Sequence, residues 1–372
     1  MTSRERVTAT LNHRRPDLVP IDFGGFVTTI EAEAYTELIR YLGIDSEIMV
    51  SARAHVAPDE AILDMFEVDT RYLWPFPVKP WQEINRQSTI RDAWGIEWHR
   101  PPGSHYFDPI KHPMADFSYE DLKHFEYPDL WDADFGRQLS RRARQLHETS
   151  EYFLIADALS VGIFETAWLL RGLERFLMDL LTDKPFAAAL LELVLKQRKD
   201  FFARFLDAVG PYVGMVMVSD DLAAQSGPIM SPELYREMIK PMHKQLNAFI
   251  KQRTDAKLLH HSCGALRPFL DDLIEVGVDI INPVQVSAAG MDSAGLKRDY
   301  GDRLVFWGGG CDTQDVLQFG STKDVKREVQ RRIEDFKPGG GFVFTQVHDI
   351  QPNTPPENVV AMFEAAKEYR RY

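Results

Sequence analysis

The chain has 372 residues, of which 44% are hydrophobic, 27% are charged and 11% are aromatic. These proportions are typical of a folded globular protein and exclude an intrinsically disordered chain. The chain has 43 lysines and arginines against 56 aspartates and glutamates, and the resulting net charge of −13 makes nucleic acid and anionic membranes unfavourable partners, because both repel an acidic surface.

Eight short apolar segments, taken in chain order, have the length and composition of buried parallel strands. They are residues 18–23, 69–74, 152–159, 214–219, 257–261, 279–283, 303–307 and 341–346. Helix-start signals lie between them. Asp183 predicts the N-cap of a helix that runs to Phe205, Ser231 predicts the N-cap of a later helix, and Thr354 predicts the N-cap of the last one.

Strands that alternate with helices predict a parallel sheet, and eight of them favour a closed (β/α)8 barrel, the α/β fold also called a TIM barrel, over an open sheet. The chain contains no internal repeat and no linker, so we expect a single domain over residues 1–372. Residues 81–113 are rich in Trp, Pro and His, and we expect them to form a β-hairpin and loop insertion on the barrel.

Polar residues follow six of the predicted strands, at the end where barrel enzymes carry their active sites. They are Asp157, Asp220 and Asp221, the segment 260–263, Asn282 and Gln285, the segment 308–312, and His348 and Asp349. Because the carboxyl ends of parallel strands meet at one mouth of a barrel, these residues predict a single pocket.

The chain has only two cysteines, too few for a disulfide framework. Its first residues are polar and contain no apolar segment typical of a secretion signal. The most apolar stretch, residues 187–195, is interrupted by Glu192 and is too short to span a membrane. We therefore expect a cytoplasmic protein without a membrane partner.

His261, Cys263 and Cys311 form the strongest candidate site. His261 and Cys263 are two residues apart at a strand end, so their side chains point to the same face, and Cys311 follows the next strand but one after three glycines. One imidazole and two thiolates suit Zn²⁺, and three protein ligands with an open position are typical of catalytic zinc. The alternative is two buried, unreactive cysteines and a histidine of the core.

Other polar residues of the pocket are candidates for a catalytic role. Asp220 or Asp221 could orient the substrate or a metal-bound histidine, or else cap a loop and a helix. His348 could donate a proton or a hydrogen bond to a leaving oxygen, or else make structural hydrogen bonds. Glu165 could be a distant zinc ligand or a carboxylate at a helix start.

Motifs along nearly the whole chain point to a known family. They include Arg4-Glu5-Arg6-Val7, Ser219-Asp220-Asp221-Leu222, His260-His261-Ser262-Cys263-Gly264, Asn282-Pro283-Val284-Gln285, Phe306-Trp307-Gly308-Gly309-Gly310 and Pro355-Pro356-Glu357-Asn358. In these motifs the chain resembles the uroporphyrinogen decarboxylase superfamily, and within it the zinc-dependent methyltransferases that work with corrinoid proteins. The resemblance implies the (β/α)8 barrel expected above.

The methyltransferase branch implies that His261, Cys263 and Cys311 hold Zn²⁺. The implied reaction moves a methyl group between a small methylated substrate, such as a phenyl methyl ether in an O-demethylation, and the cobalt of a corrinoid. No corrinoid-binding Asp-x-His-x-x-Gly signature occurs in the chain, so the corrinoid would come from a separate partner protein. A homodimer is compatible with the sequence.

The chain departs from the family pattern at two places. Uroporphyrinogen decarboxylases carry an arginine-rich N-terminal motif that binds the carboxylates of the substrate, whereas the matching residues 22–27 contain no arginine. Coenzyme M methyltransferases carry a glutamate that can fill the fourth zinc position, and the approximate equivalent here is Gln285. The fourth ligand is therefore left open among Gln285, Glu165, water and substrate.

Two other classes of function stay open from the sequence. One is a decarboxylase or lyase that uses the barrel without a metal, and the metal content of the purified protein distinguishes it from a zinc enzyme. The other is a non-catalytic barrel that binds a small ligand, and turnover with a reduced corrinoid distinguishes this class.

Overall fold

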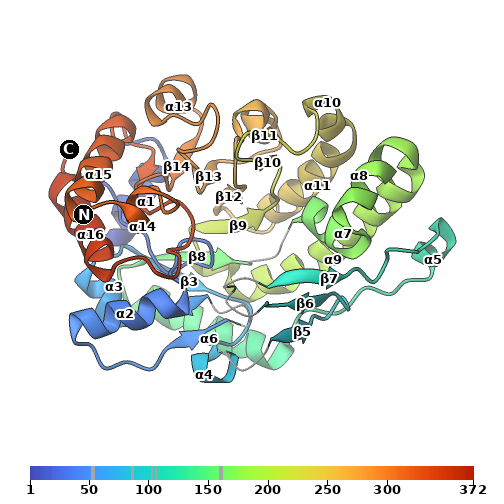
Figure 1. Cartoon of the computed structure of the whole chain (residues 1–372), viewed down its shortest axis with the longest axis horizontal. Helices are drawn as coiled ribbons and strands as arrows, with labels where there is room; N and C mark the ends of the chain where they lie inside the picture. Colours follow the sequence, from blue (N-terminus) through green and yellow to red (C-terminus); the bar gives the residue numbers. More distant parts are fainter. Residues whose placement is uncertain (52–54, 85–87, 102–103, 105–106, 159–161) are drawn as a thin grey trace.

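The central element of the computed structural model, which describes residues 1–51, 55–84, 88–101, 104, 107–158 and 162–372, is a curled parallel sheet (Figure 1). The sheet has seven strands that follow one another in chain order, and every neighbouring pair is parallel. The strands are β3 (Thr70–Leu73), β8 (Phe153–Asp157), β9 (Met215–Ser219), β12 (Lys257–His261), β13 (Ile280–Asn282), β14 (Val305–Trp307) and β15 (Phe342–Val343).

The expected strand at residues 18–23 closes this sheet into a barrel, but as an extended segment with isolated bridges. Ile21 forms a parallel bridge with Phe344, just beyond β15. On its other side the Ile21 carbonyl accepts the backbone N–H of Asp69, directly before β3, at 2.8 Å. Pro20 has no N–H to donate, which explains why no regular ladder forms here. The predicted α/β barrel is confirmed.

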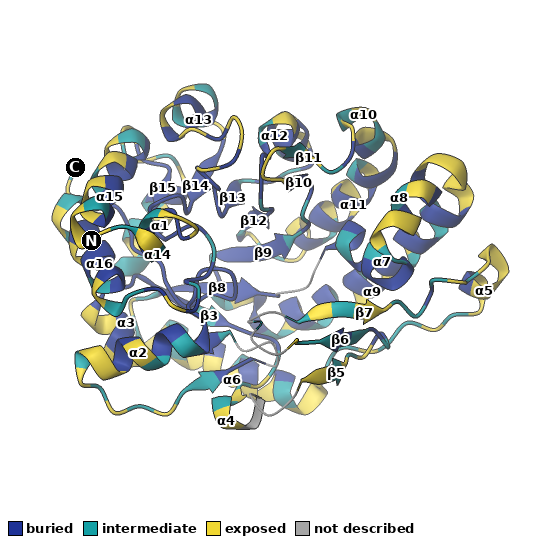
Figure 2. Cartoon of the chain, in the orientation of Figure 1, coloured by how far each residue is buried: buried dark blue, intermediate teal, exposed yellow. Residues whose placement is uncertain are grey.

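Alternate strand residues point into the barrel and outward to the helices, as a period of two requires. The inner cluster includes Ile155, Met217, Leu259 and Trp307, and both faces of the strands are buried (Figure 2). Strands buried on both faces are typical of parallel sheets covered by helices. This alternation decides which residues reach the mouth of the barrel.

Helices surround the sheet (Figure 1). The longer ones are α1 (Ser3–Leu11), α2 (Ala32–Leu42), α6 (Ala133–Thr149), α7 (Ile163–Arg171), α8 (Leu173–Thr182), α9 (Lys184–Val209), α11 (Lys240–Lys251), α13 (Ser293–Tyr300), α15 (Thr322–Phe336) and α16 (Pro356–Tyr369). Shorter ones are α3 (Glu60–Met65), α10 (Pro232–Leu234), α12 (Leu270–Glu275) and α14 (Val316–Phe319). No helix among the described residues is long and apolar enough to cross a membrane.

Two of the three expected N-caps are confirmed. Asp183 accepts a backbone N–H at the start of α9, and Ser231 does so at the start of α10. The prediction for Thr354 is wrong, because Pro355 occupies the N-cap of α16 with an extended ψ of 129°. A residue that precedes proline avoids the helical region, so Pro355, which precedes Pro356, cannot be the first helical residue.

The insertion expected at residues 81–113 is present as an antiparallel sheet. Its strands are β5 (Thr89–Arg91), β6 (Glu97–His99) and β7 (Asp108–Lys111), so a third strand joins the expected hairpin. A short helix that was not expected, α4 (Trp81–Ile84), precedes it. Trp94, Ile96 and Trp98 alternate inward and are buried, which attaches the insertion to the main core.

Candidate functional site

The mouth of the barrel is built by the inward positions at the ends of neighbouring strands. His261 pairs in register with Ser219 of β9 and with Asn282 of β13, so the three side chains lie at one level. His261 continues the inward phase of Leu259, whereas His260 has the opposite phase and faces the helices, with its ring 5.4 Å from that of His243.

The imidazole of His261 is oriented by Asn282. Nδ1 of His261 lies 2.6 Å from Oδ1 of Asn282, and the amide nitrogen of Asn282 donates to the Trp307 carbonyl at 2.9 Å. Because the amide nitrogen is engaged with Trp307, the oxygen faces His261 and accepts its Nδ1–H. The other ring nitrogen, Nε2, is left with its lone pair, and burial lowers the pKa of His261, which keeps the ring neutral.

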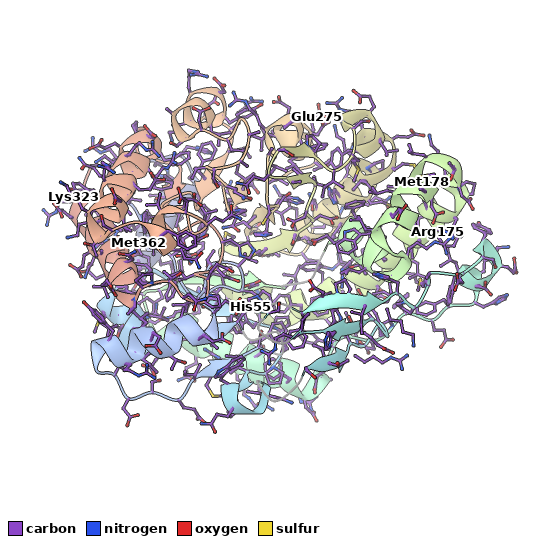
Figure 3. The ribbon with its side chains drawn as sticks, viewed as in Figure 1. His55, Arg175, Met178, Glu275, Lys323 and Met362 are labelled. Atoms are coloured by element: carbon purple, nitrogen blue, oxygen red, sulfur yellow. The ribbon has the colours of Figure 1, made fainter. Side chains whose placement is uncertain are left out.

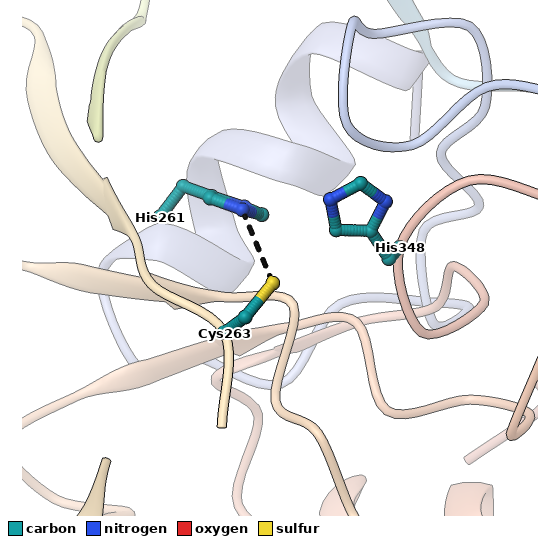
Figure 4. A group of neighbouring side chains, drawn as sticks. All are labelled: His261, Cys263 and His348. Atoms are coloured by element: carbon teal, nitrogen blue, oxygen red, sulfur yellow. Dashed lines mark hydrogen bonds between the residues drawn. The ribbon is translucent and has the colours of Figure 1, made fainter. Parts of the chain in front are cut away.

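Nε2 of His261 faces the thiol of Cys263, and the distance from Nε2 to Sγ is 3.6 Å (Figure 4). Bond lengths of about 2.3 Å to sulfur and about 2.0–2.1 Å to nitrogen place two ligands of one tetrahedral Zn²⁺ roughly 3.6 Å apart. Burial raises the pKa of Cys263 well above its usual value, and the carboxylates of Asp221, Glu165 and Asp349 raise it further. A bound cation would release the thiol proton and stabilise the thiolate.

His348 approaches the same pair from the loop after β15. Ligating atoms of His261, Cys263 and His348 all lie within 4.8 Å of one another, and the two imidazole rings are 5.2 Å apart (Figure 4). Nδ1 of His348 accepts the backbone N–H of Asp349 at 2.7 Å, which leaves the proton of the neutral ring on Nε2. Burial lowers the pKa of His348 to about 3, so the ring is an uncharged hydrogen-bond donor at neutral pH.

Cys311 is not brought to this group among the described residues. Its side chain is fully buried, and the charged groups that bear most on its pKa are Glu328, Asp312 and Arg332, two of which belong to α15. Gly308 and Gly309 have positive φ angles, 119° and 72°, which interrupt the regular strand geometry between β14 and Cys311. Cys311 as a zinc ligand therefore stays a prediction.

The two adjacent aspartates have different positions. Oδ1 of Asp221 accepts the backbone N–H of Cys263 at 2.7 Å and so fixes the loop that carries the thiol. Asp220 is fully buried, accepts two backbone N–H groups at the start of α7, and contacts Nε2 of His243 at 2.8 Å. Neither aspartate is among the described residues that line the cavity below, and a catalytic role for Asp220 or Asp221 stays a prediction.

Glu165 and Gln285, the two protein candidates for a fourth ligand, both have partners. Oε1 of Gln285 accepts the N–H of Gly264 at 2.7 Å, so its amide oxygen supports the loop after Cys263. Glu165 accepts a weak hydrogen bond from Ser219 at 3.3 Å. Burial, followed by the charges of Asp221 and Asp220, raises the pKa of Glu165 to about 8, so this carboxyl is largely protonated at neutral pH.

A cavity of about 500 Å³ opens over Cys263 and His348. The described residues that line it are Cys263, Gln285, Thr313, Gln314, Gln318, Val347, His348 and Gln351, and none is an aspartate, glutamate, lysine or arginine. We call Gln285, Gln314, Gln318 and Gln351 the glutamine rim. Three of them, Gln314, Gln318 and Gln351, were not identified from the sequence, because glutamines do not form a recognisable catalytic or metal-binding motif. Their position after predicted strands was the available signal.

A sequence model of the family described as uroporphyrinogen decarboxylase (URO-D) matches residues 95–369 of this chain. The chain belongs to the URO-D family. This confirms the superfamily expected from the sequence motifs.

Curated relatives of this URO-D family protein include a uroporphyrinogen decarboxylase of Pseudoalteromonas translucida (strain TAC 125), 26% identical over 151 residues, which are 38% of this chain and 39% of the relative. Another is the uroporphyrinogen decarboxylase of Legionella pneumophila (strain Corby), 25% identical over 200 residues, 53% of this chain and 52% of the relative. The matches therefore span about two fifths to one half of these relatives.

The fold of this URO-D family protein is similar along its whole length to a solved "methyltransferase from Methanosarcina mazei". The TM-score is 0.70 at 18% sequence identity, and the match covers 99% of each chain. At this level of identity the similarity establishes the shared barrel fold.

Proposed function

We propose that this protein is a zinc-dependent methyltransferase that moves a methyl group between a small methylated substrate and the cobalt of a separate corrinoid protein. The observation that carries the proposal is the pair His261–Cys263, with Nε2 and Sγ 3.6 Å apart and Nδ1 of His261 engaged by Asn282. A neutral imidazole whose second nitrogen is held by an amide oxygen is typical of a metal ligand.

His261 and Cys263 would hold the zinc, and Cys311 is the proposed third ligand. His348 is the competing candidate, but its Nδ1 accepts the Asp349 N–H, so its Nε2 carries a proton and is suited to donate. When bound, Zn²⁺ supplies Lewis-acid polarisation of the substrate heteroatom or holds a thiolate substrate. Asp221 fixes the Cys263 loop through its 2.7 Å hydrogen bond, and Asn282 fixes the ring of His261.

His348 is the proposed hydrogen-bond donor to the leaving heteroatom. It lines the cavity, and its ring lies beside that of His261. Because the ring is neutral, it stabilises the developing negative charge on oxygen or nitrogen by a hydrogen bond from Nε2–H, and no additional proton is stored on it. Its backbone φ of 63° lies in the left-handed region, a strained conformation that often marks functional positions.

The uncharged glutamine rim supports an amide-bearing ligand. A corrin ring carries acetamide and propionamide groups, and a glutamine amide offers both a donor and an acceptor to such groups. Uroporphyrinogen instead carries eight carboxylates, which call for arginines. In the matching N-terminal segment, Asp22 is buried and accepts hydrogen bonds from Tyr72 and Trp307, so an acidic group occupies that region.

A uroporphyrinogen decarboxylase-like reaction without metal is the second candidate function. It is favoured by the two curated relatives described above, both of which are uroporphyrinogen decarboxylases. The cytoplasmic location and the separate corrinoid protein are part of the proposal for methyl transfer.

The deciding experiment measures three quantities on one preparation of the full chain: zinc content, methylation of cob(I)alamin by methoxylated aromatics, methylamines and thioethers, and coproporphyrinogen formation from uroporphyrinogen. We expect about one zinc per chain and methyl transfer that chelation abolishes and Zn²⁺ restores. Cys263→Ser and Cys311→Ser should lose zinc, whereas His348→Gln should keep zinc and lose rate. Full zinc content in the Cys263→Ser, Cys311→Ser double variant, or porphyrinogen turnover that survives chelation, contradicts the proposal.

A further inference from the structure

A second group of ligating side chains lies beside the first and has no part in the proposed methyl transfer. It consists of Glu31, at the N-cap of α2, His55, directly before β2 (Val56–Ala57), and Asp349, the residue after His348. One imidazole nitrogen and one oxygen of each carboxyl group lie within 4.8 Å of one another. Figure 3 labels His55 near the centre of the view, and its side chain is 14% exposed.

The spacing within this group suits ligands of one ion. Nε2 of His55 and Oδ2 of Asp349 are 3.4 Å apart. A hydrogen bond between such atoms is normally about 2.7–3.2 Å long. Bonds of about 2.0–2.2 Å from a tetrahedral ion to an imidazole nitrogen and a carboxylate oxygen place the two atoms roughly 3.3–3.5 Å apart.

Glu31 provides a second, independent observation. Its side chain is only 5% exposed, and within the described part of the chain its carboxyl group receives no hydrogen bond. Other buried carboxylates of this protein have donors: Asp22 has Thr70, Tyr72 and Trp307, and Asp220 has two backbone N–H groups. A buried carboxyl group without a donor is costly, and a cation is one way to satisfy it.

We propose that Glu31, His55 and Asp349 bind a divalent transition-metal ion, such as Mn²⁺ or Zn²⁺, at a site separate from His261 and Cys263. Two carboxylates and one imidazole form a donor set of oxygen and nitrogen without sulfur, which suits these ions and differs from the thiolate set of the first site. Burial raises the pKa of Glu31 to about 8 because it disfavours the charged carboxylate. A cation that replaces the proton would offset this cost.

The ion would join the two ends of the chain at the mouth of the barrel. Ile30 forms a parallel bridge with Ile350, and Oδ1 of Asp349 accepts the backbone N–H of Thr29 at 3.0 Å, so its Oδ2 remains for the ion. Because Asp349 directly follows His348, an ion held by Asp349 also fixes the loop that carries the His348 ring. The expected role is therefore structural support of the first site.

The test uses the full chain, stripped by a chelator and dialysed against Mn²⁺, which prefers oxygen and nitrogen ligands to thiolates. Bound Mn²⁺ is counted by electron paramagnetic resonance and by elemental analysis. We expect about one Mn²⁺ per chain in the wild type and in Cys263→Ser, and loss of that ion in Glu31→Gln and in Asp349→Asn. Glu33→Gln, on the same helix, is the matched control and should keep the ion.

Thermal unfolding provides the folding control. Addition of Mn²⁺ should raise the Tm of the wild type and of Glu33→Gln, because an ion that binds only the folded state stabilises it, and should leave the Tm of Glu31→Gln unchanged. Wild-type protein that binds no Mn²⁺ would overturn the proposal in favour of a proton shared by the two carboxyl groups. Binding and a Tm rise that survive in both Glu31→Gln and Asp349→Asn would overturn it in favour of an ion held elsewhere in the protein. The result is independent of the first site, because Cys263→Ser and a failure of methyl transfer both leave it unaffected.

Discussion

Asn282 holds the imidazole of His261 from the neighbouring strand, with Oδ1 2.6 Å from Nδ1. The two residues are in register on β12 and β13, so the contact is set by the sheet itself. A ligand ring oriented from a rigid strand keeps its second nitrogen directed into the mouth.

The first prediction concerns this contact. Asn282→Ala should weaken zinc binding by about 10–100-fold, the usual effect of removing the hydrogen-bond partner of a metal-bound histidine. Competition with a chromophoric chelator measures the affinity. Asn282→Asp keeps an acceptor for Nδ1–H and should recover much of the loss. Equal zinc affinity in Asn282→Ala and the wild type would show that the contact does not orient a ligand.

Substitution of Asp220 should mainly lower the free energy of unfolding, whereas substitution of Asp221 should mainly lower the affinity for zinc. Asp220→Ala leaves two backbone N–H groups of α7 and His243 without their buried partner, and we expect a loss of about 3–5 kcal/mol in the free energy of unfolding. Asp221→Ala should leave stability nearly unchanged and weaken zinc binding, because the Cys263 loop loses its 2.7 Å hydrogen bond. Urea unfolding and zinc competition on both variants measure the difference, and the opposite pattern would refute it.

Glu165 should make stability depend on pH. Its pKa is raised from 4.5 to about 8 in the folded protein, so the folded state binds a proton that the unfolded state releases between these values. Stability is therefore expected to fall as pH rises from about 5 to about 8, with the contribution lost above the folded pKa. Glu165→Gln, which stays neutral, should flatten the decline in Tm over this range. A wild type and a variant with parallel profiles would show that Glu165 does not titrate in this window.

The glutamine rim should determine which corrinoid is accepted. Gln314→Arg combined with Gln318→Arg should raise the KM for cobalamin and favour a corrinoid whose side-chain amides have been hydrolysed to carboxylates, because guanidinium groups pair with carboxylates. Direct binding of both corrinoids, followed by their visible spectra, separates recognition from turnover. Gln245→Arg, on the exposed surface of α11, is the control. Unchanged preference in the double variant would exclude the rim from recognition.

The sequence predicted the barrel because its signals are local. Apolar segments alternate with capped helices, and strand residues such as Leu259 and His261 keep a period of two up to the mouth. The pairing of His261 with Cys263 followed from that period. The sequence could not show where Cys311 lies relative to His261 and Cys263, because that depends on the positive φ angles of Gly308 and Gly309 in the turn between them.

The sequence also could not predict contacts between segments that lie far apart along the chain. Glu31 and His55 lie far along the chain from Asp349, and no spacing rule connects them. Asn282 was recognised as polar at a strand end, but its role depends on the register between β12 and β13. Residues whose role depends on a side-chain amide or a buried hydrogen bond are difficult to recognise from a single sequence.

The bridge between Ile21 and Phe344 has a consequence for how the chain folds. The segment that closes the barrel is synthesised more than 300 residues before one of its two partners, Phe344 beside β15. Until then the early segment has only its contacts beside β3 and leaves its other edge unpaired, which is the situation in which strands pair with other molecules. Closure is therefore a late, long-range step, and we expect loss of residues 18–23 to produce aggregation of the chain while the helices still form.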